Sequence, residues 1–107
     1  GSISCDKITA SSLTIRNIGI GKVKLANVSA DQIDITNEGI GKTEIQNIKA
    51  NIVTVKNDGI GSIELSGTTN EAYYGNEGIG KIKASKLTAT KIEASNEGLG
   101  KINARNK

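Results

Sequence analysis

Asn37-Glu-Gly-Ile-Gly-Lys42 carries most of the structural information in this chain, because the chain repeats it. The five copies are Asn17-Ile-Gly-Ile-Gly-Lys22, Asn37-Glu-Gly-Ile-Gly-Lys42, Asn57-Asp-Gly-Ile-Gly-Ser62, Asn76-Glu-Gly-Ile-Gly-Lys81 and Asn96-Glu-Gly-Leu-Gly-Lys101. They begin 20, 20, 19 and 20 residues apart. A fixed period of this size is typical of a solenoid, in which each repeat forms one turn and stacks on the next.

Apolar residues recur at fixed positions between the copies. With the Asn of each copy as column 1, columns 7 and 9, 12 and 14, and 17 and 19 are apolar; the second rung has Val23, Leu25, Val28, Ala30, Ile33 and Ile35 there. A spacing of two is strand alternation, whereas a helix would need 3.6. The sequence therefore predicts an all-β protein, a single-stranded right-handed parallel β-helix of about five 20-residue rungs.

The spacing between these apolar pairs predicts how often the coil bends. Each pair of inward residues fits one short extended face, and bends separate the faces. Three pairs and the glycine-rich phrase favour four sides per turn. A three-sided coil with one blunted face is the alternative.

The repeated phrase is predicted to form the sharpest corner. Glycine adopts backbone conformations closed to other residues, and we expect the aliphatic residue between the two glycines to point inward and anchor the corner. The first Asn is expected to stack its amide on the Asn above and below. The residues of this structural corner are Asn17, Gly19, Gly21, Asn37, Gly39, Gly41, Asn57, Gly59, Gly61, Asn76, Gly78, Gly80, Asn96, Gly98 and Gly100.

Two charged columns flank the corner. The acid column is Glu38, Asp58, Glu77 and Glu97, at column 2, and the lysine column is Lys22, Lys42, Lys81 and Lys101, at column 6. Like charges repel when they stack at strand spacing. We expect the two columns to offset each other in solvent, at about 0–1 kcal/mol per pair.

One rung departs from the pattern, because it is one residue short and contains both tyrosines of the chain. When the missing residue is placed near Glu71, Thr68 and Asn70 fall where apolar residues are expected. The same alignment points Tyr74 inward and Tyr73 outward.

The irregular rung also carries the candidate binding patch, which consists of Thr69, Asn70, Glu71 and Tyr73. It is the surface feature that the other rungs do not repeat. Exposed aromatic residues beside polar groups are common at binding interfaces. The alternative is that the short rung only accommodates Tyr74 in the core.

Composition excludes several classes of function. The net charge is +3 with 14 basic residues, and only two of these are Arg, so the Arg contacts and stacking aromatics of nucleic-acid readers are missing. One Cys and no His predict no metal site, and no cofactor motif is complete. No apolar run is long enough for a transmembrane segment. Glu77 and Glu97 fit a solvated surface ladder better than the carboxylate pair of a glycosidase.

Cys5 has two interpretations. Ser2-Ile-Ser-Cys5 resembles a lipoprotein processing site, which would make Cys5 an acylated N-terminus. However, Ser2 stands where such sites have a large aliphatic residue, and Cys5 falls in inward column 9. Packing in the core is therefore the favoured interpretation.

Residues 1–107 are predicted to form a single β-helix domain. The ends of a solenoid are open strand edges that need capping, and no atypical capping repeat is visible. We expect either a fragment of a longer chain or ends that neighbouring copies cover.

The order of the columns resembles that of a known family. Glu77-Gly-Ile-Gly-Lys-Ile82, Leu87-Thr-Ala89 and Ile92-Glu-Ala94 follow the order of the head GIN domain family, the auto-transporter adhesins of bacteria. In that family a Ser-Gly-Ser-Gly-Asp corner precedes Ile-x-Val, Leu-x-Ala and Leu-x-Val. This chain has Ile or Leu in place of the inner Ser of the corner, and Lys in place of the Asp. The resemblance implies a secreted, periplasmic or cell-surface bacterial protein and supplies no catalytic residues.

The sequence therefore predicts a non-enzymatic, adhesin-like binding or structural module. Carbohydrate or a surface protein is the expected partner, and end-to-end or side-by-side homo-oligomers are compatible with the coil. A bactofilin-like cytoskeletal β-helix, self-assembling in the cytoplasm, is the alternative. A β-helical enzyme that acts on polysaccharides is the third hypothesis.

Overall fold

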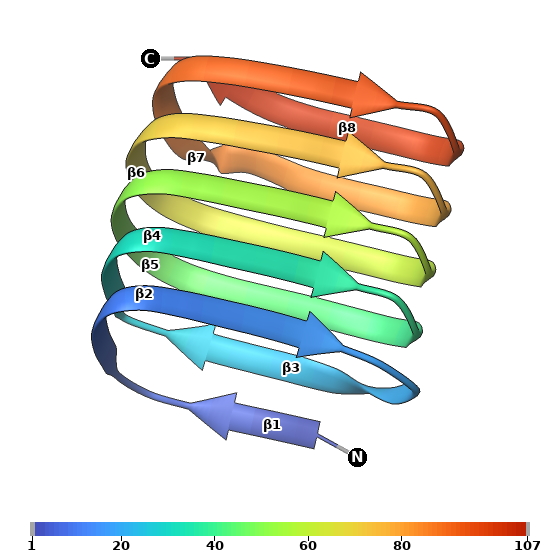
Figure 1. Cartoon of the computed structure of the whole chain (residues 1–107), viewed down its shortest axis with the longest axis horizontal. Coiled ribbons are helices and arrows are strands. Elements are labelled where there is room, and N and C mark those ends of the chain that lie inside the picture. Colours follow the sequence, from blue (N-terminus) through green and yellow to red (C-terminus); the bar gives the residue numbers. More distant parts are fainter. Residues whose placement is uncertain (1, 107) are drawn as a thin grey trace.

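The computed structural model describes residues 2–106, with side chains over residues 3–103. These residues form the predicted all-β solenoid (Figure 1). The strands are β1 (Ser2–Cys5), β2 (Ile8–Asn17), β3 (Ile20–Ala26), β4 (Val28–Asn37), β5 (Ile40–Asn57), β6 (Ile60–Asn76), β7 (Ile79–Asn96) and β8 (Leu99–Asn106). All pairs between them are parallel, in the order β1-β3-β5-β6-β7-β8, while β2 pairs with β4 and β4 with β5.

Parallel pairing between successive rungs stacks the residues of each sequence column along the coil. Val23 pairs with Thr43, Thr43 with Ile63, and Ile63 with Ile82. Each residue therefore lies directly above the residue one repeat earlier. The chain climbs from the N-terminus at one end of the rod to the C-terminus at the other (Figure 1).

The core lies inside the coil and is built from the six predicted inward columns. Its largest fully buried aliphatic side chains are Ile33, Ile35, Ile45, Ile48, Ile63, Ile82 and Leu87. Cys5 packs against this core, as the packing interpretation predicts. The first rung is less covered, and Ile3 at its inward column is 62% exposed.

The coil has three unequal sides, so the alternative prediction is right and the preferred four-sided one is wrong. One bend is the glycine corner. A second is centred on Asn27 and Asn47, whose φ angles of 56° and 55° lie in the left-handed region that Asn tolerates. A third falls at Asp31 and Gln32, where two consecutive side chains are exposed and the strand alternation is interrupted. Figure 1 shows the glycine corner as the narrow edge of the coil and the other bends as the broad edge.

The aliphatic residue between the two glycines points outward, which overturns the prediction that it anchors the core. Ile20, Ile40, Ile60, Ile79 and Leu99 are 78%, 50%, 49%, 51% and 70% exposed. The physical reason is strand parity. Column 4 is three residues from inward column 7 on one continuous strand, so it must face the opposite way. We call these five residues the ridge.

The register of the short rung also differs from the predicted one. The missing residue lies opposite Gln46 and Asn47, where the pairing shifts, and not near Glu71. Gly67 therefore pairs with Ile48 and Thr69 with Ala50, which places both at inward columns. Thr68 and Asn70, predicted to be inward, are exposed.

A glycine explains why the chain shortens at that point. A Cβ on Gly67, whose φ is 133°, would overlap the backbone of Ile48. The backbone of this rung therefore runs close to the rung below it. Tyr74 points into the core, as predicted, and is 3% exposed.

Candidate functional site

The asparagines of the corner form a ladder inside the coil. The Nδ2 of Asn17 donates to the Oδ1 of Asn37 at 3.1 Å, and each following Asn donates to the next at 2.9–3.0 Å. The last, Asn96, donates to the carbonyl oxygen of Gly100 at 3.0 Å. Asn37, Asn57 and Asn76 are buried. The ladder thus satisfies polar groups that burial would otherwise leave unpaired.

The corner glycines are needed because the backbones of successive rungs touch. A Cβ on Gly39 or Gly59 would overlap the carbonyl oxygen of the glycine below. The same close stack lets the amide of Ile40 donate to the oxygen of Gly19 at 2.7 Å. A side chain at these glycines would force the rungs apart.

The acid column takes its cations from the strand that precedes the corner. Arg16 lies 2.9 Å from Glu38, and Lys56 lies 3.8 Å from both Asp58 and Glu77. Among the described residues Glu97 has no ion pair. Contacts with its acidic neighbours raise the pKa of Glu77, and the hydrogen bond with Asp58 has the largest effect. The positive charge of Lys56 acts in the opposite direction but does not outweigh them.

The lysine column turns the other way, toward the strand that follows the corner. Lys42 lies 3.3 Å and Lys83 3.5 Å from opposite oxygens of Glu64. Burial alone would raise the pKa of Glu64, but the hydrogen bonds and charges of Lys42 and Lys83 lower it. The prediction that the acid and lysine columns neutralise each other is wrong, because the ridge separates them.

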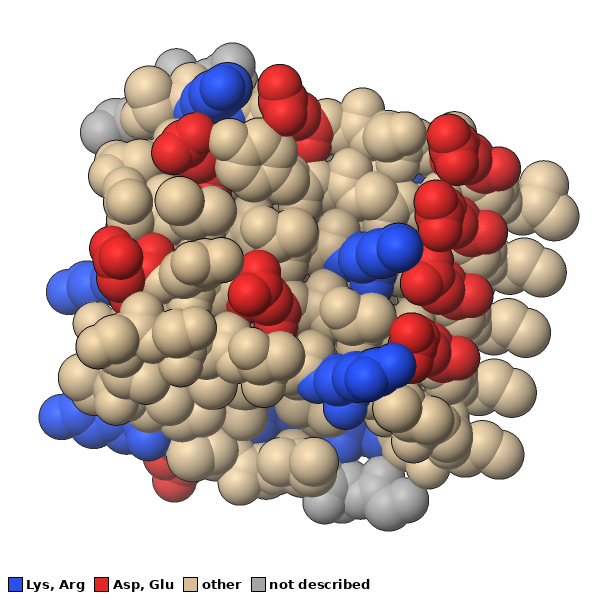
Figure 2. Space-filling view, in the orientation of Figure 1, with Lys and Arg blue, Asp and Glu red and all other residues tan. Residues whose placement is uncertain are grey.

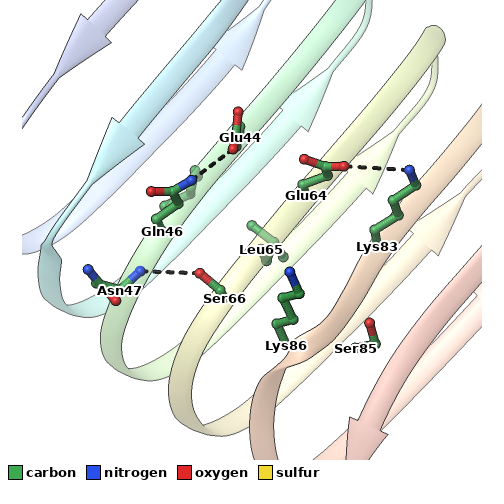
Figure 3. A pocket seen from close by; sticks show the side chains of 10 residues that line it. Glu44, Gln46, Asn47, Glu64, Leu65, Ser66, Lys83, Ser85 and Lys86 are labelled. Carbon is green, nitrogen blue, oxygen red and sulfur yellow. Dashed lines mark hydrogen bonds and ion pairs between the residues drawn. The ribbon is translucent and has the colours of Figure 1, made fainter.

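A first groove lies over the second bend, beside the short rung. It has a volume of about 330 Å³ and a polar lining that includes Gln46, Asn47, Ser66 and Lys86. In Figure 3 the side chains of Glu64 and Lys83, on neighbouring rungs of its lining, point toward each other and form an ion pair. The side-chain amide of Gln46 donates to the carboxylate of Glu44 at 2.8 Å. The backbone amide of Asn47 donates to the hydroxyl of Ser66 at 3.4 Å. These groups already satisfy one another, so the groove offers few free contacts to a ligand.

The members of the candidate binding patch divide between surface and core. The hydroxyl of Tyr73 donates to Glu71 Oε1 at 2.7 Å, and this bond raises the pKa of Tyr73. Asn70 is exposed and donates to Asn51 at 2.7 Å. Thr69 is buried, and its hydroxyl donates to the Glu71 carbonyl oxygen at 3.1 Å. The structure therefore brings Tyr73 and Glu71 together at the surface and turns Thr69 inward.

A second hollow lies next to Tyr73 and could not be predicted from single motifs. It has a volume of about 380 Å³, and its lining includes Tyr73, Lys56, Glu77, Glu93 and Ser95. Gly75 also lines it and contributes no side chain. The hollow combines an aromatic ring with carboxylates, an ammonium group and a hydroxyl. The sequence signal that could have revealed this hollow is the stacking of column 18, in which Tyr73 pairs with Glu93.

Two classes of feature are missing from the part of the chain that the structure describes. Within it, no group of His, Cys, Asp and Glu side chains could hold a metal ion. No described helix is long and apolar enough to cross a membrane.

Comparison with protein families agrees with the fold and the column order. The family model described as "Putative auto-transporter adhesin, head GIN domain" matches residues 1–107. The chain belongs to this family. The resemblance predicted from the corner and strand order is thereby confirmed. Neither a curated protein nor a solved structure shows a significant match to the chain.

Proposed function

We propose that this protein is a non-enzymatic, adhesin-like module of the bacterial cell surface, which binds carbohydrate through the hollow beside Tyr73. The observation that carries the proposal is the bond of 2.7 Å from the Tyr73 hydroxyl to Glu71. It orients the ring at the edge of the hollow before any ligand arrives. The family description supports an adhesive role at the cell surface.

The chemistry of the hollow suits a sugar ring. The apolar C–H face of a sugar can stack on Tyr73, and its hydroxyls can bond to Glu77, Glu93 or Ser95, which line the same hollow. Preorganised aromatic side chains bind at a low entropic cost. Among the described residues, Lys56 is the one basic residue lining the hollow, against Glu77, Glu93 and Glu97. We therefore expect neutral or amino sugars to bind in preference to acidic ones.

The proposal predicts that removing the Tyr73 ring removes glycan binding. Tyr73→Ala should lose binding to the best ligand from a glycan array, measured by titration calorimetry, because the stacking surface is gone. Tyr73→Phe should retain most of the affinity.

Thr14→Ala is the matched control, because Thr14 occupies the same outward column in the first rung. Unchanged affinity in Tyr73→Ala would contradict the proposal. Filaments in electron micrographs would instead favour the bactofilin-like hypothesis. Cleavage of a bound glycan that Glu77→Gln or Glu97→Gln abolishes would favour the enzyme.

A further inference from the structure

The outward ridge is the largest feature that the proposed function leaves unexplained. Ile40, Ile60 and Ile79 project side by side from successive rungs, and each is about half exposed. Figure 2 shows a row of uncharged side chains that stands out at one edge of the molecule, beside a row of acidic side chains. Soluble proteins seldom expose a continuous apolar row unless it makes contacts.

A groove runs along the ridge. It has a volume of about 620 Å³ and is lined by ridge residues on one side and by acid-column residues such as Asp58 on the other. Its floor is formed by Gly19, Gly39, Gly59 and Gly78, which have no side chains. An apolar row of the same repeat spacing could lie in this groove.

The charges beside the ridge are only partly neutralised. Lys56 forms ion pairs with both Asp58 and Glu77. Among the described residues, Glu97 has no ion pair. On the other side of the ridge, Lys22, Lys81 and Lys101 likewise have no ion pair within the described part of the chain. Each column thus contains charged residues without a counter-ion in the described part of the chain, and the other column carries charges of the opposite sign.

We propose that a second copy of this chain covers the ridge, in a two-fold dimer whose axis runs parallel to the solenoid. The ridge of each copy then lies in the glycine-floored groove of the other. The acid column of each copy faces the lysine column of its partner at the same height, so that Glu77 of one copy lies opposite Lys81 of the other, and Glu97 opposite Lys101.

Symmetry selects this arrangement over the antiparallel one. Across the surface the order is lysine column, ridge, groove and acid column. Rotation about an axis parallel to the solenoid reverses this order in the partner, so that ridge meets groove and acid meets lysine. Rotation about an axis perpendicular to the solenoid and lying in the interface preserves the order, so that ridge meets ridge and acid meets acid.

The width of the ridge predicts a dimer that depends on its charges. Standard interfaces bury about 800 Å² per partner. A ridge one side chain wide cannot supply that area alone, so the flanking columns must be part of the contact. We therefore expect the association to weaken as salt concentration rises.

Sedimentation equilibrium from micromolar to millimolar concentration tests the proposal. The wild-type protein should form dimers. The acid variant (Glu77→Lys with Glu97→Lys) and the lysine variant (Lys81→Glu with Lys101→Glu) should each self-associate about tenfold more weakly, or worse. A mixture of the two variants should associate again, because their columns become complementary. Lys49→Glu with Lys91→Glu, on exposed columns away from the ridge, is the charge-matched control and should behave like wild type.

A change in the ridge provides an independent test. Ile40→Lys with Ile60→Lys should be monomeric at every concentration and should keep the circular dichroism of the wild type, because both side chains are at the surface. A wild-type protein that is monomeric at millimolar concentration would overturn the proposal. Association that strengthens with salt and also strengthens in the acid variant, whose new lysines would then face Glu38 and Asp58, would instead show the antiparallel arrangement. Tyr73→Ala should dimerise normally, so failure of the dimer and failure of glycan binding are distinguishable.

Discussion

At the scale of single residues, the buried polar groups of the core are of two kinds. Some have hydrogen-bond partners on neighbouring rungs, and others have none among the described residues. Asn57 is fully buried and has partners on both sides, Asn37 and Asn76. The hydroxyls of Tyr74 and Thr43 are also buried and have no partner among the described residues. The first kind of group stabilises the coil and the second kind reduces its stability.

Asn57→Ala should therefore destabilise the protein strongly. The substitution leaves the amide of Asn37 and the oxygen of Asn76 unpaired in the core, at a cost of about 1–3 kcal/mol for each group. Urea unfolding followed by circular dichroism measures the change. Asn70→Ala, at an exposed Asn, is the control and should lie within about 0.5 kcal/mol of wild type. Equal effects of the two substitutions would show that the ladder adds nothing.

Tyr74→Phe should stabilise the protein, because it removes a buried hydroxyl without a partner. We expect a gain of about 1 kcal/mol at neutral pH. Burial also raises the pKa of Tyr74 to about 12.

The raised pKa of Tyr74 predicts a difference in alkaline solution. The folded state binds the phenol proton of Tyr74 more tightly than the unfolded state does. The free energy of unfolding therefore keeps its neutral-pH value below pH 10 and falls as the pH rises toward 12, because the unfolded state loses this proton first. Relative to Tyr74→Phe, the wild type should lose roughly 2–3 kcal/mol across that range. Unfolding midpoints of both proteins at several pH values measure the difference, in which the titration of the lysines cancels. A constant difference would contradict the assignment.

At the scale of the rung, the corner is defined by the close approach of glycine backbones. Gly59→Ala should separate adjacent rungs, because its Cβ would overlap the oxygen of Gly39. We expect a loss of several kcal/mol or failure to fold, since overlap with backbone cannot be relieved by a side-chain rotation.

Gly75→Ala is the matched control, because the nearest atom to its Cβ would be the oxygen of Val55 at 4.0 Å. It should have an unfolding midpoint close to that of wild type in the same urea titration. If Gly59→Ala were equally well tolerated, the stacked glycines would not be what fixes the corner.

The rung could be predicted from the sequence wherever one rule of alternation applied. Columns 7 and 9, 12 and 14, and 17 and 19 follow a period of two within each pair, so the inward faces of the regular rungs and the inward Tyr74 are as predicted. The outward direction of Ile40 was also available from parity with Thr43, but a hydrophobic residue between two glycines favoured burial instead. The left-handed conformation of Asn27 in the bend after column 9 could not be predicted, because a left-handed Asn has no unique signature in the sequence.

At the scale of the whole molecule, two hollows lie on either side of the acid column. The Tyr73 hollow appears once and includes Glu77 and Glu97 in its lining, whereas the ridge and its groove run along successive rungs. In the proposed dimer the two copies of Tyr73 would lie at the same height along the rod. Two sugar sites on one particle increase the effective affinity for a surface that displays many glycans.

The orientation of the ridge is the central claim, because the corrected fold and the proposed dimer both depend on it. Ile60 and Ile63 are three residues apart on one strand and are 49% and 0% exposed. The most direct measurement compares the free energies of unfolding of Ile60→Lys and Ile63→Lys, at concentrations where both are monomeric. Ile60→Lys should lie within about 0.5 kcal/mol of the wild-type monomer. Ile63→Lys should lose several kcal/mol or fail to fold, because it buries an unpaired charge. If Ile60→Lys unfolded and Ile63→Lys did not, the ridge would be in the core and the account would be wrong.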